Sequence, residues 1–134
     1  MRRTLSLVAL FLFASSAALA QAGPRVQLVR SHCERSSGRR PAEDPSGSAT
    51  RRRNGTLVVR MTAHAACQSE PSLEPRLEGD RLSLEIHEHR SARCGMCAYQ
   101  MTARVTGAAG ASEIHVTHER SPNVPQVTIA VPSR

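Results

Sequence analysis

Aromatic residues are nearly absent from this 134-residue chain, which contains one tyrosine, two phenylalanines and no tryptophan. Both phenylalanines, Phe11 and Phe13, lie close to the start of the chain, so Tyr99 is the one aromatic residue in the remainder. Proteins that bind single-stranded nucleic acid usually stack the bases on aromatic side chains, so nucleic acid is not expected as a partner. The buried tryptophan of antibody-type immunoglobulin cores is lacking as well.

Lysine is also absent, so all 18 basic residues are arginines, and with 11 acidic residues they give a formal charge of +7. A basic balance is typical of proteins that contact nucleic acid or anionic surfaces. The densest groups of arginines lie in one polar stretch, at Arg39, Arg40, Arg51, Arg52 and Arg53. The pattern favours a solvated loop, and the alternative is a weak contact with an anionic lipid or polysaccharide surface.

Long hydrophobic runs are missing too, because the apolar segment at residues 5–12 is too short to cross a bilayer. Two arginines precede this segment, and a small-x-small motif ending at Ala20 follows it. This order predicts a secretory signal peptide over residues 1–20, cleaved after Ala20. Because Gln21 stands where a lipoprotein has cysteine, the mature chain is predicted to be soluble, secreted or periplasmic, without a transmembrane segment.

The chain that remains after cleavage is long enough for one domain with a modest core. Residues 21–33 contain a predicted first strand. Residues 34–53 have no large apolar side chain and are rich in Ser, Gly, Pro and Arg, which predicts a flexible loop or linker. Residues 54–134 are predicted to form the core of the domain.

Apolar and polar residues alternate in several short segments, which is the pattern of half-buried β-strands. Turn signals separate the segments, among them Gly79-Asp80 and Asn54-Gly55, the latter also matching a glycosylation sequon with Thr56. We expect strands near residues 25–33, 56–67, 73–77, 81–89, 98–106, 113–117 and 126–131. About seven strands without helical periodicity predict an all-β fold, a small antiparallel, immunoglobulin-like β-sandwich, with a small barrel as the alternative.

Four cysteines in a small exported domain predict two disulfides, for which three connectivities exist. The alternation places Cys67 and Cys97 on inward faces, which favours the pairs Cys67–Cys97 and Cys33–Cys94. The alternative pairs, Cys67–Cys94 and Cys33–Cys97, differ by a shift of only three residues and stay open.

The Cys94-Gly95-Met96-Cys97 motif has two other interpretations. A redox pair needs a helix N-terminus to lower the thiol pKa, whereas the following segment reads as a strand. Cysteine, histidine and methionine together suit copper(I) or zinc. The alternative to a stapled module is therefore a periplasmic metal-binding protein, with Cys94, Cys97, His87 and His89 as candidate ligands.

Three short motifs follow one another in the part of the chain after residue 54. Asn54-Gly55-x-Leu57 opens a strand that ends at Cys67, Gly79-Asp80-x-Leu82 opens another, and Cys97-Ala98-Tyr99 leads into a strand closed by Gly107. In these features the stretch from Asn54 to about Val131 resembles a group of small exported bacterial domains of unknown function, many of them lipoproteins. The resemblance implies a β-sandwich and no particular activity. This chain departs from the group in lacking a lipidation cysteine and a C-x-C-x-C cluster.

No serine, cysteine or carboxylate lies in a motif that assigns it nucleophilic or acid–base chemistry, so neither an enzyme nor a cofactor is expected. The sequence predicts an exported, non-catalytic module that is stabilised by disulfides and has a binding or structural role in the cell envelope. Its expected partner is an envelope protein or an anionic surface.

Overall fold

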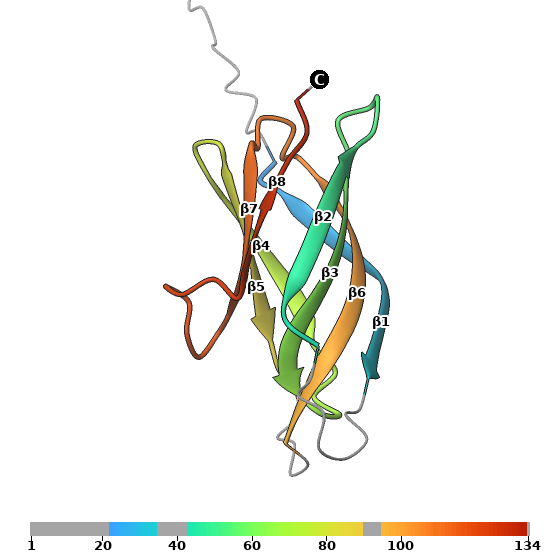
Figure 1. Ribbon diagram of the computed structural model, residues 1–134. Helices are drawn as coiled ribbons and strands as arrows, with labels where there is room; N and C mark the ends of the chain where they lie inside the picture. The colour runs from blue at the N-terminus through green and yellow to red at the C-terminus, as the bar shows by residue number, and fades with distance from the viewer. Residues whose placement is uncertain (1–21, 35–42, 90–94, 134) are drawn as a thin grey trace, which may run out of the picture.

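The computed structural model describes residues 22–34, 43–89 and 95–133 (Figure 1). The predicted signal peptide, Arg39, Arg40 and Cys94 lie outside these described residues. Within the described ranges the chain contains no helix, and hence none that could span a membrane. Its eight strands are β1 (Arg25–Glu34), β2 (Ser46–Arg51), β3 (Leu57–Ala66), β4 (Ser72–Glu78), β5 (Arg81–His87), β6 (Met96–Thr106), β7 (Glu113–His118) and β8 (Val127–Ala130).

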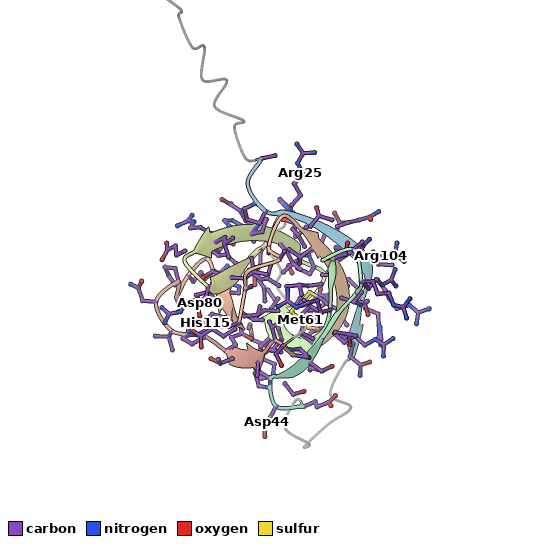
Figure 2. All side chains as sticks on the ribbon, turned by 90° about the horizontal axis from the view of Figure 1, so that it is seen from above. Arg25, Asp44, Met61, Asp80, Arg104 and His115 are labelled. Atoms are coloured by element: carbon purple, nitrogen blue, oxygen red, sulfur yellow. A yellow bond between two sulfur atoms is a disulfide. The ribbon has the colours of Figure 1, made fainter. Side chains whose placement is uncertain are left out.

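The strands form two four-stranded sheets, which confirms the all-β class. The first sheet has the order β1-β6-β3-β2 and the second the order β4-β5-β7-β8 (Figure 1). The two sheets share one hydrophobic core. Figure 2 shows Met61 in the middle of the molecule, with Arg104 and His115 toward opposite sides. The inner faces hold the fold together, and the outer faces are available for contacts.

The predicted alternation of apolar and polar residues is confirmed in β3, β5, β6 and β7. In these strands every second side chain is apolar and almost wholly buried, because successive side chains of a strand point to opposite faces. The alternating buried positions are Leu57, Val59, Met61 and Ala63 in β3, Leu82, Leu84 and Ile86 in β5, Tyr99, Met101, Ala103 and Val105 in β6, and Ile114 and Val116 in β7. These side chains make up most of the core.

A β-bulge interrupts the pairing of β1 with β6. Leu28 lies opposite Ala103 and Arg30 lies opposite Thr102, so Val29 is an extra residue without a partner on β6. A single extra residue reverses the face on which all later side chains lie. The bulge therefore places Arg30 on the outer face of the sheet and Cys33 on the inner side.

The predicted linker at residues 34–53 needs correction, because residues 46–51 form β2 and pair with β3. The sequence Ser-Gly-Ser-Ala-Thr-Arg has no large apolar side chain, so its alternation could not be detected. Gly47 accommodates Ile129 of β8, since a Cβ atom at this glycine would lie 2.9 Å from Ile129 Cγ1. The sheets consequently have eight strands rather than about seven, and the core is not confined to residues 54–134.

The prediction of purely antiparallel sheets is wrong for one pair, because β5 and β7 are parallel. Between these two strands the chain crosses to the first sheet, forms β6 there and then returns. A chain that returns to its sheet after one crossing can run parallel to the strand it left. The expected turn at Asn54-Gly55 is confirmed, since the Arg52 N–H donates to the Thr56 carbonyl across it (2.8 Å).

Gly107 is a position at which a side chain should be costly. Its φ is +75°, and an added Cβ would lie 3.1 Å from the Gly23 carbonyl oxygen and 3.3 Å from Pro24 Cα. We expect Gly107→Ala to lower the free energy of unfolding by about 1–3 kcal/mol in urea denaturation. The control Gly110→Ala has open space around the new atom and should change stability by less than about 0.5 kcal/mol. Equal stability of the two variants would contradict this packing.

Candidate functional site

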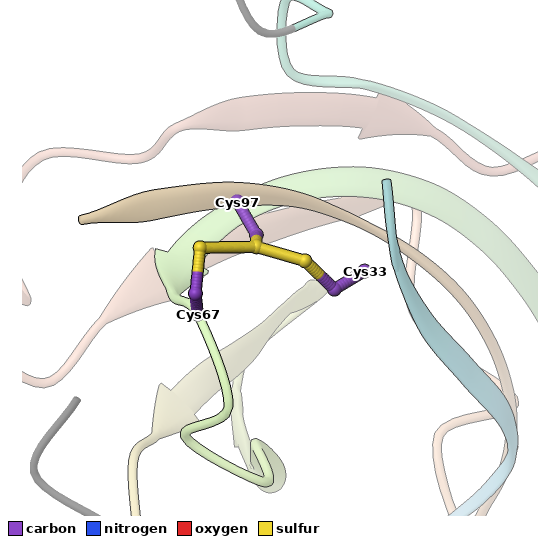
Figure 3. A group of neighbouring side chains, drawn as sticks. All are labelled: Cys33, Cys67 and Cys97. Carbon is purple, nitrogen blue, oxygen red and sulfur yellow. A yellow bond between two sulfur atoms is a disulfide. The ribbon is translucent and has the colours of Figure 1, made fainter. Parts of the chain in front are cut away.

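Three cysteines meet at one end of the core. Cys33 lies near the end of β1, Cys67 directly follows β3, and Cys97 lies at the start of β6. Their three sulfur atoms lie within 4.8 Å of one another. Figure 3 shows the Cys97 sulfur between the other two. Cys67 and Cys97 are 5% and 1% exposed, so solvent has little access to them.

Strand register brings these cysteines together. Cys97 pairs with Ala65 on β3, two residues before Cys67, while Cys33 pairs with Tyr99 on β6. The Cα atom of Cys97 lies 5.0 Å from that of Cys67 and 5.6 Å from that of Cys33, both within the range for a disulfide. One sulfur forms one disulfide, so these two contacts are alternatives. The geometry suits Cys67–Cys97 of the favoured pairing and Cys33–Cys97 of the alternative one, so the connectivity stays a prediction.

The two histidines proposed as metal ligands lie apart from this sulfur group. His89 Nε2 is 2.6 Å from Ser72 Oγ. The His87 ring lies among three glutamates on the second sheet: Nε2 is 2.9 Å from Glu85 and 3.2 Å from Glu74, and Nδ1 is 3.2 Å from Glu119. Nε2 makes no hydrogen bond of good geometry with the described residues. Within the described ranges, the sulfur group contains cysteines alone.

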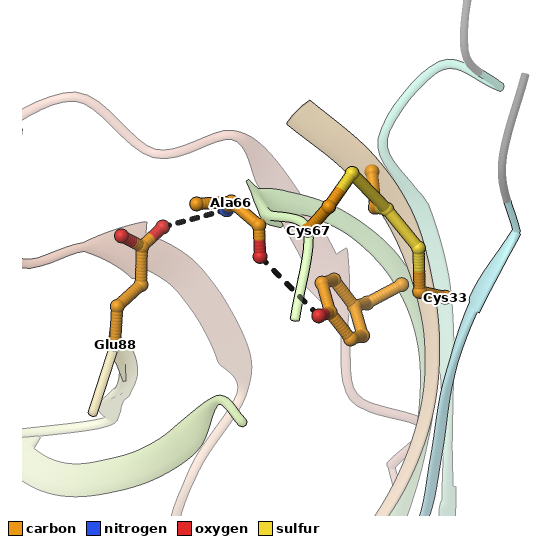
Figure 4. Close-up of a disulfide and its surroundings, with 6 residues drawn as sticks. Cys33, Ala66, Cys67 and Glu88 are labelled. Carbon is orange, nitrogen blue, oxygen red and sulfur yellow. Dashed lines mark hydrogen bonds between the residues drawn. A yellow bond between two sulfur atoms is a disulfide. The ribbon is translucent and has the colours of Figure 1, made fainter. Parts of the chain in front are cut away.

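A buried polar network adjoins the cysteines. The Ala66 N–H donates to Glu88 Oε1 (2.7 Å), and the Ala66 carbonyl accepts from the Tyr99 hydroxyl (3.2 Å; Figure 4). The Glu88 side chain is 3% exposed and also contacts His118 Nε2 (2.8 Å) and the Arg120 guanidinium (3.1 Å). This carboxylate therefore links the end of β3 to the second sheet. Sequence reasoning missed it, although Glu88 lies in the expected strand 81–89 and continues the inward alternation of Leu82, Leu84 and Ile86.

Several opposing effects act on the ionisation of Glu88. Burial raises its pKa, but the hydrogen bonds from Ala66 and His118 and the charges of His118 and Arg120 lower it further than burial raises it. The pKa of this carboxyl is consequently below its ordinary value. Glu88 is therefore charged at neutral pH, and the network contains a buried anion with its partners in place.

The loop after Cys67 is strained. Gln68 and Glu70 have φ angles of 61° and 48°, a left-handed conformation that costs non-glycine residues of order 1–3 kcal/mol. The hydroxyl of Ser69, between them, is buried without a hydrogen-bond partner among the described residues. Backbone hydrogen bonds hold the loop, including Cys67 N–H to the Gly95 carbonyl (2.9 Å). The cysteines thus lie beside a loop that its surroundings constrain.

The arginines of the polar stretch differ in their contacts. The Arg51 guanidinium donates to the carbonyl oxygens of Ala109, Ala111 and Pro132, which ties β2 to two other segments. Arg52 and Arg53 are exposed in the turn that follows. Arg51 thus has a structural contact that its position in an arginine run did not indicate.

A different set of arginines lies on the outer face of the first sheet. Arg30 of β1 and Arg60 of β3 both pair with Thr102 of β6, and Arg104 lies two residues farther along β6. A depression of about 440 Å³ lies on this face, and among the described residues no carboxylate lines it. Its polar lining includes Arg30, His32, Ser46, Ser48, Arg60 and Thr62. Sequence analysis did not predict this group, because its members come from strands far apart in the chain.

The outer side of the second sheet carries the opposite charge. Two arginines, Arg76 and Arg81, accompany a larger number of carboxylates there, namely Glu74, Glu78, Glu85, Glu113 and Glu119. A polar cleft of about 260 Å³ lies over β4, β5 and β7. The two outer faces are therefore basic and acidic, respectively.

The Glu88 network predicts a loss of stability in acid. A carboxyl whose pKa is lowered by folding stabilises the folded state above its unfolded pKa of about 4.3, and this contribution disappears as the pH falls through the folded value. We expect Glu88→Gln to lower the free energy of unfolding by about 2 kcal/mol at pH 7. The difference from the unsubstituted protein should shrink between pH 5 and pH 3.

Urea denaturation across this pH range measures both effects. The control is Glu78→Gln, which removes an exposed carboxylate of β4 and should change stability by less than about 0.5 kcal/mol at pH 7. A Glu88→Gln difference that does not depend on pH would show that the carboxylate charge contributes nothing.

No family model, curated protein or solved structure matches the chain. The resemblance to small exported bacterial domains, which depends on motifs such as Cys97-Ala98-Tyr99, therefore stays a prediction.

Proposed function

We propose that this protein is an exported, non-catalytic module of immunoglobulin-like sandwich type, which is stapled by disulfides and acts through its surface in the periplasm or outside the cell. The observation that carries the proposal is the meeting of Cys33, Cys67 and Cys97 at one end of the core. Disulfides between such cysteines form and persist in compartments where thiols are oxidised. Export through the predicted signal peptide at residues 1–20 would supply that environment.

The core of this domain is small, so disulfides would contribute a large part of its stability. Several of its buried positions hold only alanine, such as Ala63, Ala65 and Ala103, and Tyr99 is its one aromatic side chain. Small domains with limited apolar burial commonly depend on disulfides. A Cys67–Cys97 bridge, with a sequence separation of 30, would contribute about 3–4 kcal/mol in the chain-entropy model.

Intact mass spectrometry of the protein from the exported fraction tests the proposal, with and without alkylation under native conditions. We expect a mass that begins at Gln21, two disulfides and no alkylated thiol. Peptide mapping without reduction should then find Cys67 linked to Cys97. A mass that retains residues 1–20, or four alkylatable thiols, would refute the proposal.

Metal binding is the second candidate, and the same sulfur group favours it. Three thiolates within 4.8 Å of one another can bind copper(I) or zinc, the ions that prefer sulfur ligands. The ligands would then be Cys33, Cys67 and Cys97. The set expected from the sequence included His87 and His89 instead.

Elemental analysis of the protein prepared anaerobically without chelators distinguishes the two candidates. Metal binding predicts about one equivalent of metal, thiols that become alkylatable after chelation, and loss of the metal in Cys97→Ser. His87→Ala serves as the control and should retain the metal. A metal-free protein with two disulfides would exclude this candidate.

A further inference from the structure

We infer that the outer face of the first sheet binds an acidic polysaccharide through Arg30, Arg60 and Arg104. The inference rests on the proposed function, because it identifies the surface through which the exported module acts. We call this group of three residues the arginine face.

Strand register sets the spacing of the arginine face. Arg30 and Arg60 lie on either side of Thr102, in strands that are both neighbours of β6. Neighbouring strands are about 4.8 Å apart, so the two arginine backbones are separated by about 10 Å. Arg104 lies two residues along β6 from Thr102, which adds about 7 Å in the other direction. The cations are therefore spread over a distance comparable to a disaccharide, which suits a polymer with repeated charges.

The chemistry around these arginines matches an acidic sugar. Guanidinium groups bind carboxylates with two parallel hydrogen bonds. The depression beside them is lined by the hydroxyl-bearing residues Ser46, Ser48, Thr62 and Thr102. Such hydroxyls can exchange hydrogen bonds with those of a sugar. A uronic acid polymer carries carboxylates and hydroxyls. The arginines of this surface can bind the carboxylates, and its serines and threonines can bind the hydroxyls.

The charge distribution favours an anion at this face. Arg30, Arg60 and Arg104 are exposed, whereas the arginines in the ion pairs found within the described ranges are Arg76, Arg81 and Arg120. Glu74, Glu78, Glu85, Glu113 and Glu119 lie on the other sheet, while Glu43 and Asp44 precede β2 and do not line the depression. A surface of one charge sign attracts oppositely charged polymers and orients their approach.

Other anionic partners fit this face less well. Single-stranded nucleic acid is usually bound by stacking on aromatic side chains, and Tyr99 is buried in the core. Binding to a lipid surface uses apolar side chains that enter the membrane. The exposed large apolar residues of the described chain are Val29, Met96 and Val124, and none of them lines the depression.

Titration of the oxidised mature protein with polygalacturonate, a chain of carboxylate sugars, tests the inference, with dextran as the neutral control polymer. We expect binding to polygalacturonate alone, and loss of that binding in 1 M salt, where the screening length is about 3 Å. The variant Arg30→Gln/Arg60→Gln should bind roughly 5- to 20-fold more weakly, since each exposed ion pair contributes about 2- to 5-fold.

A matched control removes the same charge elsewhere. Arg52→Gln/Arg53→Gln changes two exposed arginines of the β2–β3 turn and should weaken binding less than twofold. An equal loss in both variants would show that binding follows net charge and would overturn the inference. Circular dichroism of each variant checks that the sheets are retained.

Three further outcomes would overturn the inference and leave the proposed function intact. The first is an oxidised, processed protein that does not bind polygalacturonate. The second is preferential binding to phosphatidylglycerol vesicles, which would assign the arginine face to a lipid surface. The third is self-association at low salt that disappears in Arg30→Gln/Arg60→Gln, which would assign it to the acidic face of a second copy. Free thiols in the purified protein would instead refute the proposed function.

Discussion

The β-bulge at Val29 is the constraint on which both the cysteine group and the arginine face depend. Side chains alternate between the two faces of a strand, so one extra residue in β1 exchanges the faces of everything that follows. Leu28 contributes to the core before the bulge, and Cys33 approaches Cys97 after it. Arg30 lies outward for the same reason. In a regular ladder Cys33 would face solvent and Arg30 would face the core.

The sequence predicted the strands that have clear alternation and missed the features that depend on distant pairing. Leu82, Leu84 and Ile86 alternate with polar residues, and the buried face of β5 followed directly from this pattern. β2 has no comparable pattern, since it is an edge strand whose stability comes from its pairing with β3. The parallel pairing of β5 with β7 could not be predicted either, because it depends on where β6 lies between them in the chain.

In the candidate sites too, features set by local alternation were predictable, and features set by pairing with distant strands were not. The inward positions of Cys67 and Cys97 were predictable from alternation within their own strands, and both are buried. The approach of Cys33 required the bulge, and the grouping of Arg30 with Arg60 required the register of β6 between β1 and β3. Glu88 continues the inward alternation of Leu82, Leu84 and Ile86, but its role was not predictable, because its partners at Ala66, His118 and Arg120 come from other parts of the chain.

Nuclear Overhauser contacts across β1 and β6 test the central claim most directly, using isotope-labelled oxidised protein. The account predicts that Thr102 shows cross-strand contacts to Arg30 on one side and Arg60 on the other, while Val29 lacks a partner on β6. Contacts that place Thr102 opposite Val29 would indicate a regular ladder. They would contradict the placement of both Cys33 and Arg30.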